Sequence, residues 1–92
     1  MYSFDLSDKL KFKLHKLAKK DRKRFEIVNR KIREIVAIDP ALIDHYKNLR
    51  HDMSDRKRVH IDGPFIMTFR VDKARDFIFF LDYDHHDNIY GR

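Results

Sequence analysis

The apolar residues of this chain follow two different periods, one in each half of the sequence. In the first half, Leu10, Leu14 and Leu17 recur at the spacing of one helix face, with lysines on the other face. A break at 19–21 precedes a second helical stripe, which consists of Phe25, Val28, Ile32, Ile35 and Val36. This second helix is expected to end before Pro40, because proline disfavours the helical conformation of the residue before it. A short alternating segment at 2–6 predicts a strand ahead of both helices.

The second half predicts three strands, over 56–61, 65–71 and 77–83. Asp62, Gly63 and Pro64 supply turn chemistry between the first two of them. Residues 40–55 are expected to be irregular, with a short helical turn near 41–43. The predicted order is strand, helix, helix and three strands. This order predicts an α+β fold in which two helices pack on one face of an antiparallel-type sheet, in a single domain spanning 1–92.

Side chains on a strand alternate between the two faces of a sheet, and this alternation predicts which of them cover the core. The helix-covered face is expected to carry Val59, Ile61, Phe65, Met67, Phe69, Phe77, Phe79 and Leu81. The opposite, open face is expected to carry Arg56, Arg58, His60, Ile66, Thr68, Arg70, Phe80 and Asp82. An extra residue in one strand would reverse the assignment. The open face combines basic, polar and aromatic groups, so we expect the functional residues there.

The formal charge of +6 is concentrated in the helical half of the chain. Twelve Lys or Arg residues lie between 9 and 33, where only two acidic residues oppose them. Such clustering predicts a polyanionic partner, and the alternative is a solvated helix face that keeps the protein soluble. The residues predicted to contact RNA or the ribosome are Lys16, Lys19, Lys20, Arg22, Lys23, Arg56, Lys57 and Arg70.

Composition argues against several other classes of protein. The chain has no cysteine, which excludes disulfides and thiolate metal sites. Its longest apolar run, at 77–81, is far shorter than the roughly 20 residues of a membrane span, and the first residues do not resemble a secretory signal. We therefore expect a cytoplasmic protein. No cofactor or metal is expected, because the two glycines form no phosphate-binding loop and the adjacent histidines at 85 and 86 would point apart.

Arg58 and His60 lie two residues apart and so project from the same side of a strand. Histidine can transfer protons near neutral pH, and the arginine fork suits a phosphate, so the pair fits metal-free RNA cleavage. His85, His86 and Tyr90 follow the last predicted strand, where aromatic rings could also hold RNA bases by stacking. The alternatives are a phosphate contact without catalysis for Arg58 and an ordinary exposed strand position for His60.

The order and spacing of these motifs resemble the RelE/ParE superfamily of type II toxins over essentially the whole chain. The motifs are Asn48-Leu49-Arg50, Arg58-Val59-His60-Ile61-x-Gly63, the run from Phe65 to Val71, and His-His-x-x-Ile-Tyr near the end. The tail is most similar to YafQ-type members, in which a histidine lies four residues before an aromatic that a glycine follows. His86, Tyr90 and Gly91 match those positions.

The resemblance implies a ribosome-dependent mRNA endoribonuclease that is neutralised by a small antitoxin. By position, His86 would be the general acid or base and Tyr90 would stack on or position the substrate. Arg58 and His60 match basic strand positions that contact the phosphate, and His85 matches the histidine that opens a common ending of the superfamily. RelE-type toxins often carry an arginine where this chain has Ile66, so transition-state charge would rest on Arg58, with Arg70 as a second candidate.

Two other functions are compatible with the same resemblance. ParE-type members poison gyrase and share the fold without the nuclease residues, and a degenerate toxin would bind RNA without cutting it. The expected partners are an antitoxin, the ribosome and mRNA, in a homodimer or a toxin–antitoxin hetero-oligomer. An acidic amphipathic helix or strand would suit the basic, partly apolar surface.

Overall fold

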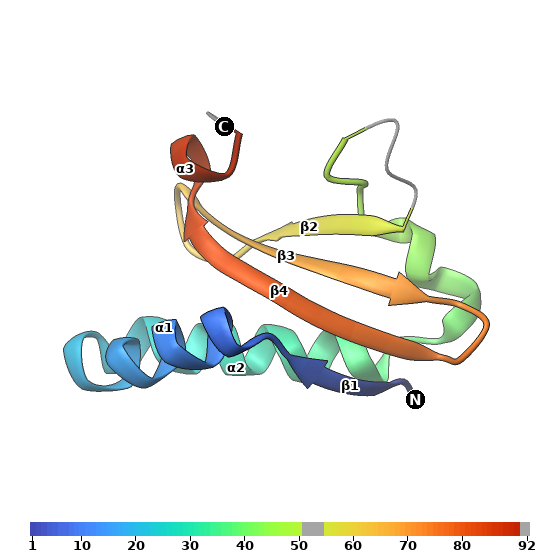
Figure 1. The fold of residues 1–92 in the computed structure, drawn as a ribbon, viewed down its shortest axis with the longest axis horizontal. Helices are drawn as coiled ribbons and strands as arrows, with labels where there is room; N and C mark the ends of the chain where they lie inside the picture. The colour runs from blue at the N-terminus through green and yellow to red at the C-terminus, as the bar shows by residue number, and fades with distance from the viewer. Residues whose placement is uncertain (51–54, 91–92) are drawn as a thin grey trace.

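The computed structural model describes residues 1–50 and 55–90, which form a four-stranded sheet with helices on both sides (Figure 1). The elements in chain order are β1 (Ser3–Leu6), α1 (Asp8–Lys20), α2 (Arg22–Ala37), the 3-10 helix η1 (Pro40–His45), β2 (Arg56–His60), β3 (Phe65–Asp72), β4 (Phe77–His85) and α3 (His86–Tyr90). The predicted α+β order is confirmed, and the last strand is two residues longer than expected. The short helix α3 was not predicted.

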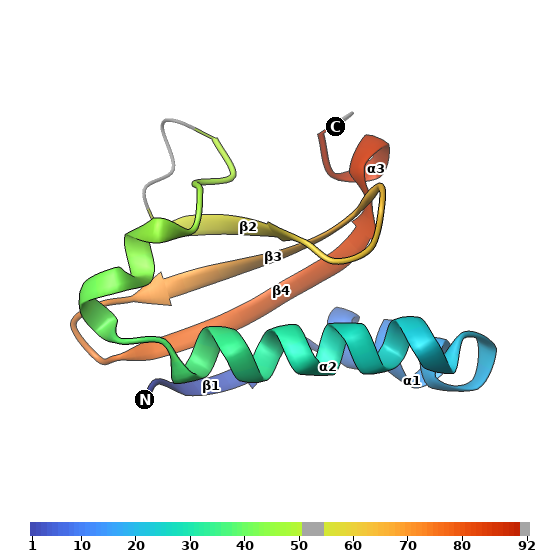
Figure 2. The same cartoon turned by 180° about the vertical axis from the view of Figure 1, so that it is seen from behind.

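The helices α1 and α2 form an antiparallel pair that covers one face of the sheet, as the two opposite views show (Figures 1 and 2). The Ser7 hydroxyl caps α1 by accepting a hydrogen bond from the Leu10 amide at 3.0 Å. Asp21 caps α2 in the same way, through the Arg24 amide at 3.1 Å, which confirms the predicted break. The buried helix residues are those of the predicted stripes, namely Leu10, Leu14, Val28, Ile32, Ile35 and Val36.

The sheet is mixed, with the strand order β1-β4-β3-β2. The pairs β2–β3 and β3–β4 are antiparallel, whereas β1 and β4 are parallel, which corrects the expectation of an antiparallel-type sheet. The helix pair explains why β1 and β4 are parallel. It returns the chain to the end of the sheet where β1 starts, and there the Tyr2 amide donates a hydrogen bond to the Val36 carbonyl at 2.9 Å. Strand β2 starts at that end, β3 runs back, and β4 therefore runs in the same direction as β1.

The predicted faces of β4 are wrong, because its register with β3 shifts between Thr68 and Phe69. Thr68 pairs with Asp82 and Phe69 with Phe80, so that Leu81 is an extra residue in β4. Phe80 is completely buried against the helices, and Phe79 lies on the other face. Phe80 is therefore unable to stack on RNA bases. Asp82, beyond the extra residue, pairs with Thr68 and keeps its predicted face, and Lys9 and Lys13 of α1 bind its carboxylate.

Within the described residues, no helix is both long and apolar enough to cross a membrane.

Candidate active site

Four residues that the sequence singled out line one small surface pocket. Arg58 and His60 come from β2, and His86 and Tyr90 come from α3. Leu49 completes the lining of this pocket, which has a volume of about 250 Å³. Figures 1 and 2 show α3 on the side of the sheet away from α1 and α2. The pocket thus lies on the open side of the sheet, and we call it the β2–α3 pocket.

Helix α3 brings the two residues of the chain end together. His86 and Tyr90 are four residues apart and so occupy one face of the helix, where their ring centroids lie 4.8 Å apart. The Arg58 guanidinium lies 6.0 Å from the Tyr90 ring centroid, within range of a cation–π contact. The strand prediction stopped at Tyr83 and missed this helix. The four-residue spacing of His86 and Tyr90 was the signal that could have revealed it.

Strand β2 presents Arg58 and His60 on one side, as their spacing predicted. The segment at 47–49 pairs with the outer edge of β2 and holds it in place. The Leu49 amide donates to the Arg56 carbonyl at 2.8 Å, and the Arg58 amide donates to the Lys47 carbonyl at 3.0 Å. This pairing places Leu49 in the wall of the β2–α3 pocket. We expected this segment to be an irregular loop, because its apolar residues show no regular spacing.

His85 does not line the β2–α3 pocket. As the last residue of β4 it pairs with Phe65, and the two rings meet edge to face at a centroid distance of 5.7 Å. Its Nδ1 accepts a hydrogen bond from the Asp87 amide at 3.1 Å. Because α3 begins at the next residue, His85 and His86 point in different directions. Of the two adjacent histidines, the structure places only His86 with Arg58.

The Ile66 side chain is completely buried, so the position at which the resemblance leads us to expect an arginine belongs here to the interior. Arg70, the second candidate for binding a phosphate, is exposed and packs over the Phe79 ring at 6.0 Å. It lines a different groove from Arg58. Within the β2–α3 pocket, the permanent positive charge comes from Arg58 alone among the described residues.

The groups in the β2–α3 pocket suit proton transfer next to an anion. His60 and His86 are exposed, so solvent and a substrate can reach both imidazoles. The carboxylate Oδ1 of Asp87 lies 3.4 Å from Nδ1 of His86. The arginine supplies a fixed positive charge, and the tyrosine supplies an aromatic surface. No group of three or more His, Cys, Asp or Glu residues suited to a metal ion occurs in the described part of the chain.

The structure separates the predicted RNA contacts into exposed and buried cations. Five of them are exposed around the turn between α1 and α2, namely Lys16, Lys19, Lys20, Arg22 and Lys23. Arg56 is half-buried on β2. Lys57 is only 2% exposed, and its ammonium donates to Asn48 Oδ1 at 2.9 Å and the Tyr46 carbonyl at 3.2 Å. Lys57 is therefore not exposed to solvent as expected, because its alternating position on β2 turns it toward the core.

A larger groove of about 950 Å³ lies beside η1 and the turn between β3 and β4. Three of its charged groups pair with each other. Asp44 binds Lys73 at 2.7 Å and Lys57 at 3.1 Å, and the hydrogen bonds from these two lysines lower the pKa of Asp44. None of the predicted catalytic residues lines this groove, so we do not place the active site there.

Comparisons with known proteins agree with this fold. No protein-family model matches the chain. A protein of Methanocaldococcus jannaschii named as the candidate toxin RelE4 is 44% identical over 92 residues, which are 100% of this chain and 94% of that protein. An uncharacterised protein of Methanosarcina mazei is 42% identical over 90 residues, 98% of this chain and 100% of its own length.

Two solved structures share the architecture at low sequence identity. A chain of the intact Escherichia coli RelBE toxin–antitoxin complex matches with a TM-score of 0.73 at 15% identity, over 92% of this chain and 96% of that one. The solution structure of a conserved hypothetical protein from Helicobacter pylori matches with a TM-score of 0.58 at 19% identity, over 98% and 100%. These two likenesses concern the fold, whereas the full-length identity of 44% extends to the sequence. The chain belongs to the RelE family of toxins.

Proposed function

We propose that this toxin cuts mRNA on the ribosome and that the β2–α3 pocket is its active site. The observation that carries the proposal is the meeting of Arg58 and His60 from β2 with His86 and Tyr90 from α3. The two pairs come from elements that are far apart in the sequence, and together they supply a guanidinium, two accessible imidazoles and a phenol. Membership of the RelE family supports the same reading.

The proposed reaction needs no group beyond those of the pocket and the RNA. His86 takes the proton from a ribose 2′-hydroxyl, and the 2′-oxygen attacks the neighbouring phosphorus. The bond from phosphorus to the 5′-oxygen breaks, and His60 supplies the proton that this oxygen takes up. Arg58 balances the charge that develops on the phosphate, and Tyr90 positions the substrate through its hydroxyl as well as its ring. The products are a 2′,3′-cyclic phosphate and a 5′-hydroxyl.

We expect His86→Ala and Tyr90→Phe to relieve growth arrest when the toxin is expressed. Loss of one acid–base group costs about 10²–10⁴-fold in rate, so cleavage of ribosome-bound mRNA should fall by about that factor in His86→Ala. His15→Ala is the matched control, since His15 is an exposed histidine of α1, far from α3 in the sequence. If both pocket variants remain as toxic as the wild type, the β2–α3 pocket is not the active site.

The alternative functions give different results with the same purified protein. A gyrase poison would inhibit DNA supercoiling and leave ribosome-bound mRNA intact. A degenerate toxin would bind RNA with a steep dependence on salt and yield no cut message.

We also propose that a small acidic antitoxin neutralises the toxin. The chain carries a net charge of +6, and large side chains such as Phe4, Phe12 and Leu42 are exposed on it. An acidic amphipathic segment would cover both kinds of surface. A neighbouring open reading frame for such a protein should yield a product that co-purifies with the toxin, with His86→Ala and with Tyr90→Phe alike. Failure of all three to bind it would contradict this part of the proposal.

A further inference from the structure

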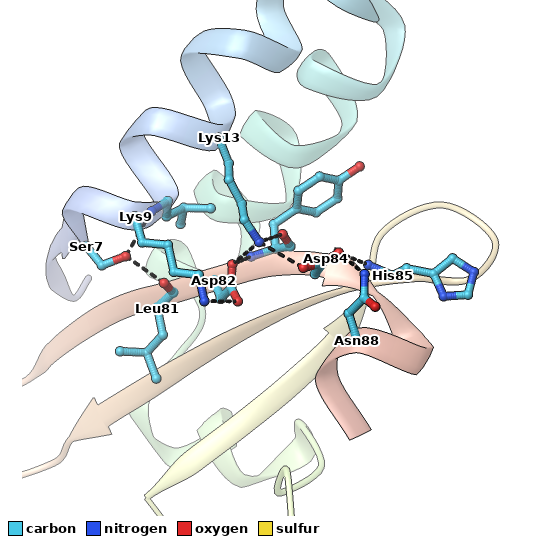
Figure 3. Close-up of polar contacts among 10 residues, drawn as sticks. Ser7, Lys9, Lys13, Leu81, Asp82, Asp84, His85 and Asn88 are labelled. Carbon is cyan, nitrogen blue, oxygen red and sulfur yellow. Dashed lines mark hydrogen bonds and ion pairs between the residues drawn. The ribbon is translucent and has the colours of Figure 1, made fainter. Parts of the chain in front are cut away.

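One lysine of α1 holds the end of β4 from the far side of the sheet. The Lys13 ammonium donates to Asp82 Oδ1 at 2.7 Å, to Asp84 Oδ2 at 3.0 Å and to the Tyr83 carbonyl at 3.0 Å (Figure 3). Its side chain is 30% exposed, and those of Asp82 and Asp84 are 9% and 24% exposed. The three acceptors lie within three consecutive residues, so Lys13 fixes this part of the backbone as well as two carboxylates.

Asp84 connects Lys13 to α3. Its Oδ1 accepts hydrogen bonds from the His85 amide at 2.7 Å and from the Asn88 side-chain amide at 2.9 Å, while Oδ2 binds Lys13 (Figure 3). Asn88 lies in the middle of α3, between His86 and Tyr90. A continuous series of contacts therefore runs from α1 through Lys13, Asp84 and Asn88 to the helix that carries half of the β2–α3 pocket.

Helix α3 depends on such outside contacts because it has only five residues. A helix of this length is unstable by itself, since forming its first turn costs more than the few hydrogen bonds return. Ile89 is its only buried residue, and the His86 amide donates to the Pro64 carbonyl at 2.7 Å. These two contacts hold the start and the inner side of α3, and the Asp84–Asn88 bond fixes its rotation.

We infer that Lys13 and Asp84 are positioning residues, which hold α3 in the orientation that places His86 and Tyr90 opposite Arg58. This inference rests on the proposed function of the β2–α3 pocket. Neither residue lines the pocket, so both act through α3 and do not touch the RNA. The charge state agrees with this role: burial raises the pKa of Asp84, but the hydrogen bonds from Asn88 and Lys13 outweigh burial and lower it to about 2.

The test uses Lys13→Met, Asp84→Asn and the double variant. The matched control is Lys11→Met with Asp5→Asn, which removes another ion pair of α1, an exposed one of 3.6 Å to β1. We measure the cleavage rate at saturating ribosome concentration, the ribosome affinity, and the contact between the His86 and Tyr90 rings by NMR. All measurements are made well below the unfolding temperature of each variant.

Each single variant should cleave about 10- to 100-fold more slowly, because small misplacements of catalytic groups cost that much. The ribosome affinity should stay within about twofold, since no RNA contact is removed. The double variant should be no slower than the slower single one, because both changes break the same series of contacts. The ring contact of His86 and Tyr90 should weaken in all three variants and persist in the control.

Variants with wild-type cleavage rates and an unchanged ring contact would overturn the inference. A rate loss that the control shares, or that follows a loss of fold, would also overturn it, because the cluster would then only stabilise the protein. If Asp84→Asn does not fold, Asn88→Ala replaces it, since Asn88 is exposed and its loss breaks only the last contact of the series. If the wild type does not cleave, the proposed function fails, and the ring contact still decides the role of Lys13 and Asp84.

Discussion

Lys57 and Lys20 carry the same charge in opposite surroundings, and the difference decides what each can bind. The Lys57 ammonium is buried and donates to three oxygen atoms, of Asp44, Tyr46 and Asn48. Lys20 is exposed at the end of α1, where the next helix begins. A polyanion can reach only the second lysine. At the scale of single residues, then, exposure is what separates a structural cation from a candidate RNA contact.

This difference predicts the salt dependence of ribosome binding. Lys20→Met should lower the slope of log affinity against log salt concentration by about 0.7 to 1, as expected for one lost phosphate contact. Lys57→Met should leave the slope unchanged and lower the unfolding temperature, because Asn48 and the Tyr46 carbonyl lose their donor. Binding measured over a range of salt concentrations tests both. A reduced slope in Lys57→Met would show that this lysine reaches RNA after all.

At the scale of elements, regular patterns of apolar residues could be predicted from the sequence, whereas single irregular features could not. The helices α1 and α2 were recognisable because their apolar stripes extend over several turns, and Arg58 and His60 because strand alternation is a matter of geometry. The extra residue in β4 could not be recognised in the sequence, since Leu81 is as apolar as the four residues before it. It reversed the faces of Phe79 and Phe80. Helix α3 has only five residues, so the four-residue spacing of His86 and Tyr90 was its one sign in the sequence, and tertiary contacts form it.

The contacts between elements predict a loss of stability in acid. The folded protein holds the pKa of Asp84 at about 2, against 3.8 for an ordinary aspartate. The stability that this carboxylate contributes is therefore fully present above about pH 4 and is lost as the pH falls toward 2. Its size is about 1–2 kcal/mol, because the side chain is 24% exposed and solvent screens it in part.

Urea unfolding at about pH 7, 4 and 2 measures this contribution. The wild type should lose about 1–2 kcal/mol more than Asp84→Asn between the two lower values, and the two proteins should differ most at neutral pH. Equal losses in both proteins would mean that Asp84 is not held in its charged form by α1 and α3.

In the whole molecule, the basic helices α1 and α2 and the candidate catalytic residues lie on opposite sides of the sheet. The basic helices cover one side, and α3, which carries two residues of the β2–α3 pocket, lies on the other (Figures 1 and 2). Both views place α3 toward the same end of the molecule as the turn between α1 and α2. Under the proposed function, the ribosome, as a large anionic particle, would contact the exposed lysines of that turn while its message enters the pocket. A short free RNA cannot easily reach both.

The most direct test of the central claim is the chemistry of the cut ends on ribosome-bound mRNA. Attack by the 2′-hydroxyl predicts a 2′,3′-cyclic phosphate and a 5′-hydroxyl, and no cleavage when the attacked ribose is replaced by 2′-deoxyribose. Cleavage of the deoxy-substituted message, a 5′-phosphate product, or an uncut message with active wild-type toxin would contradict it.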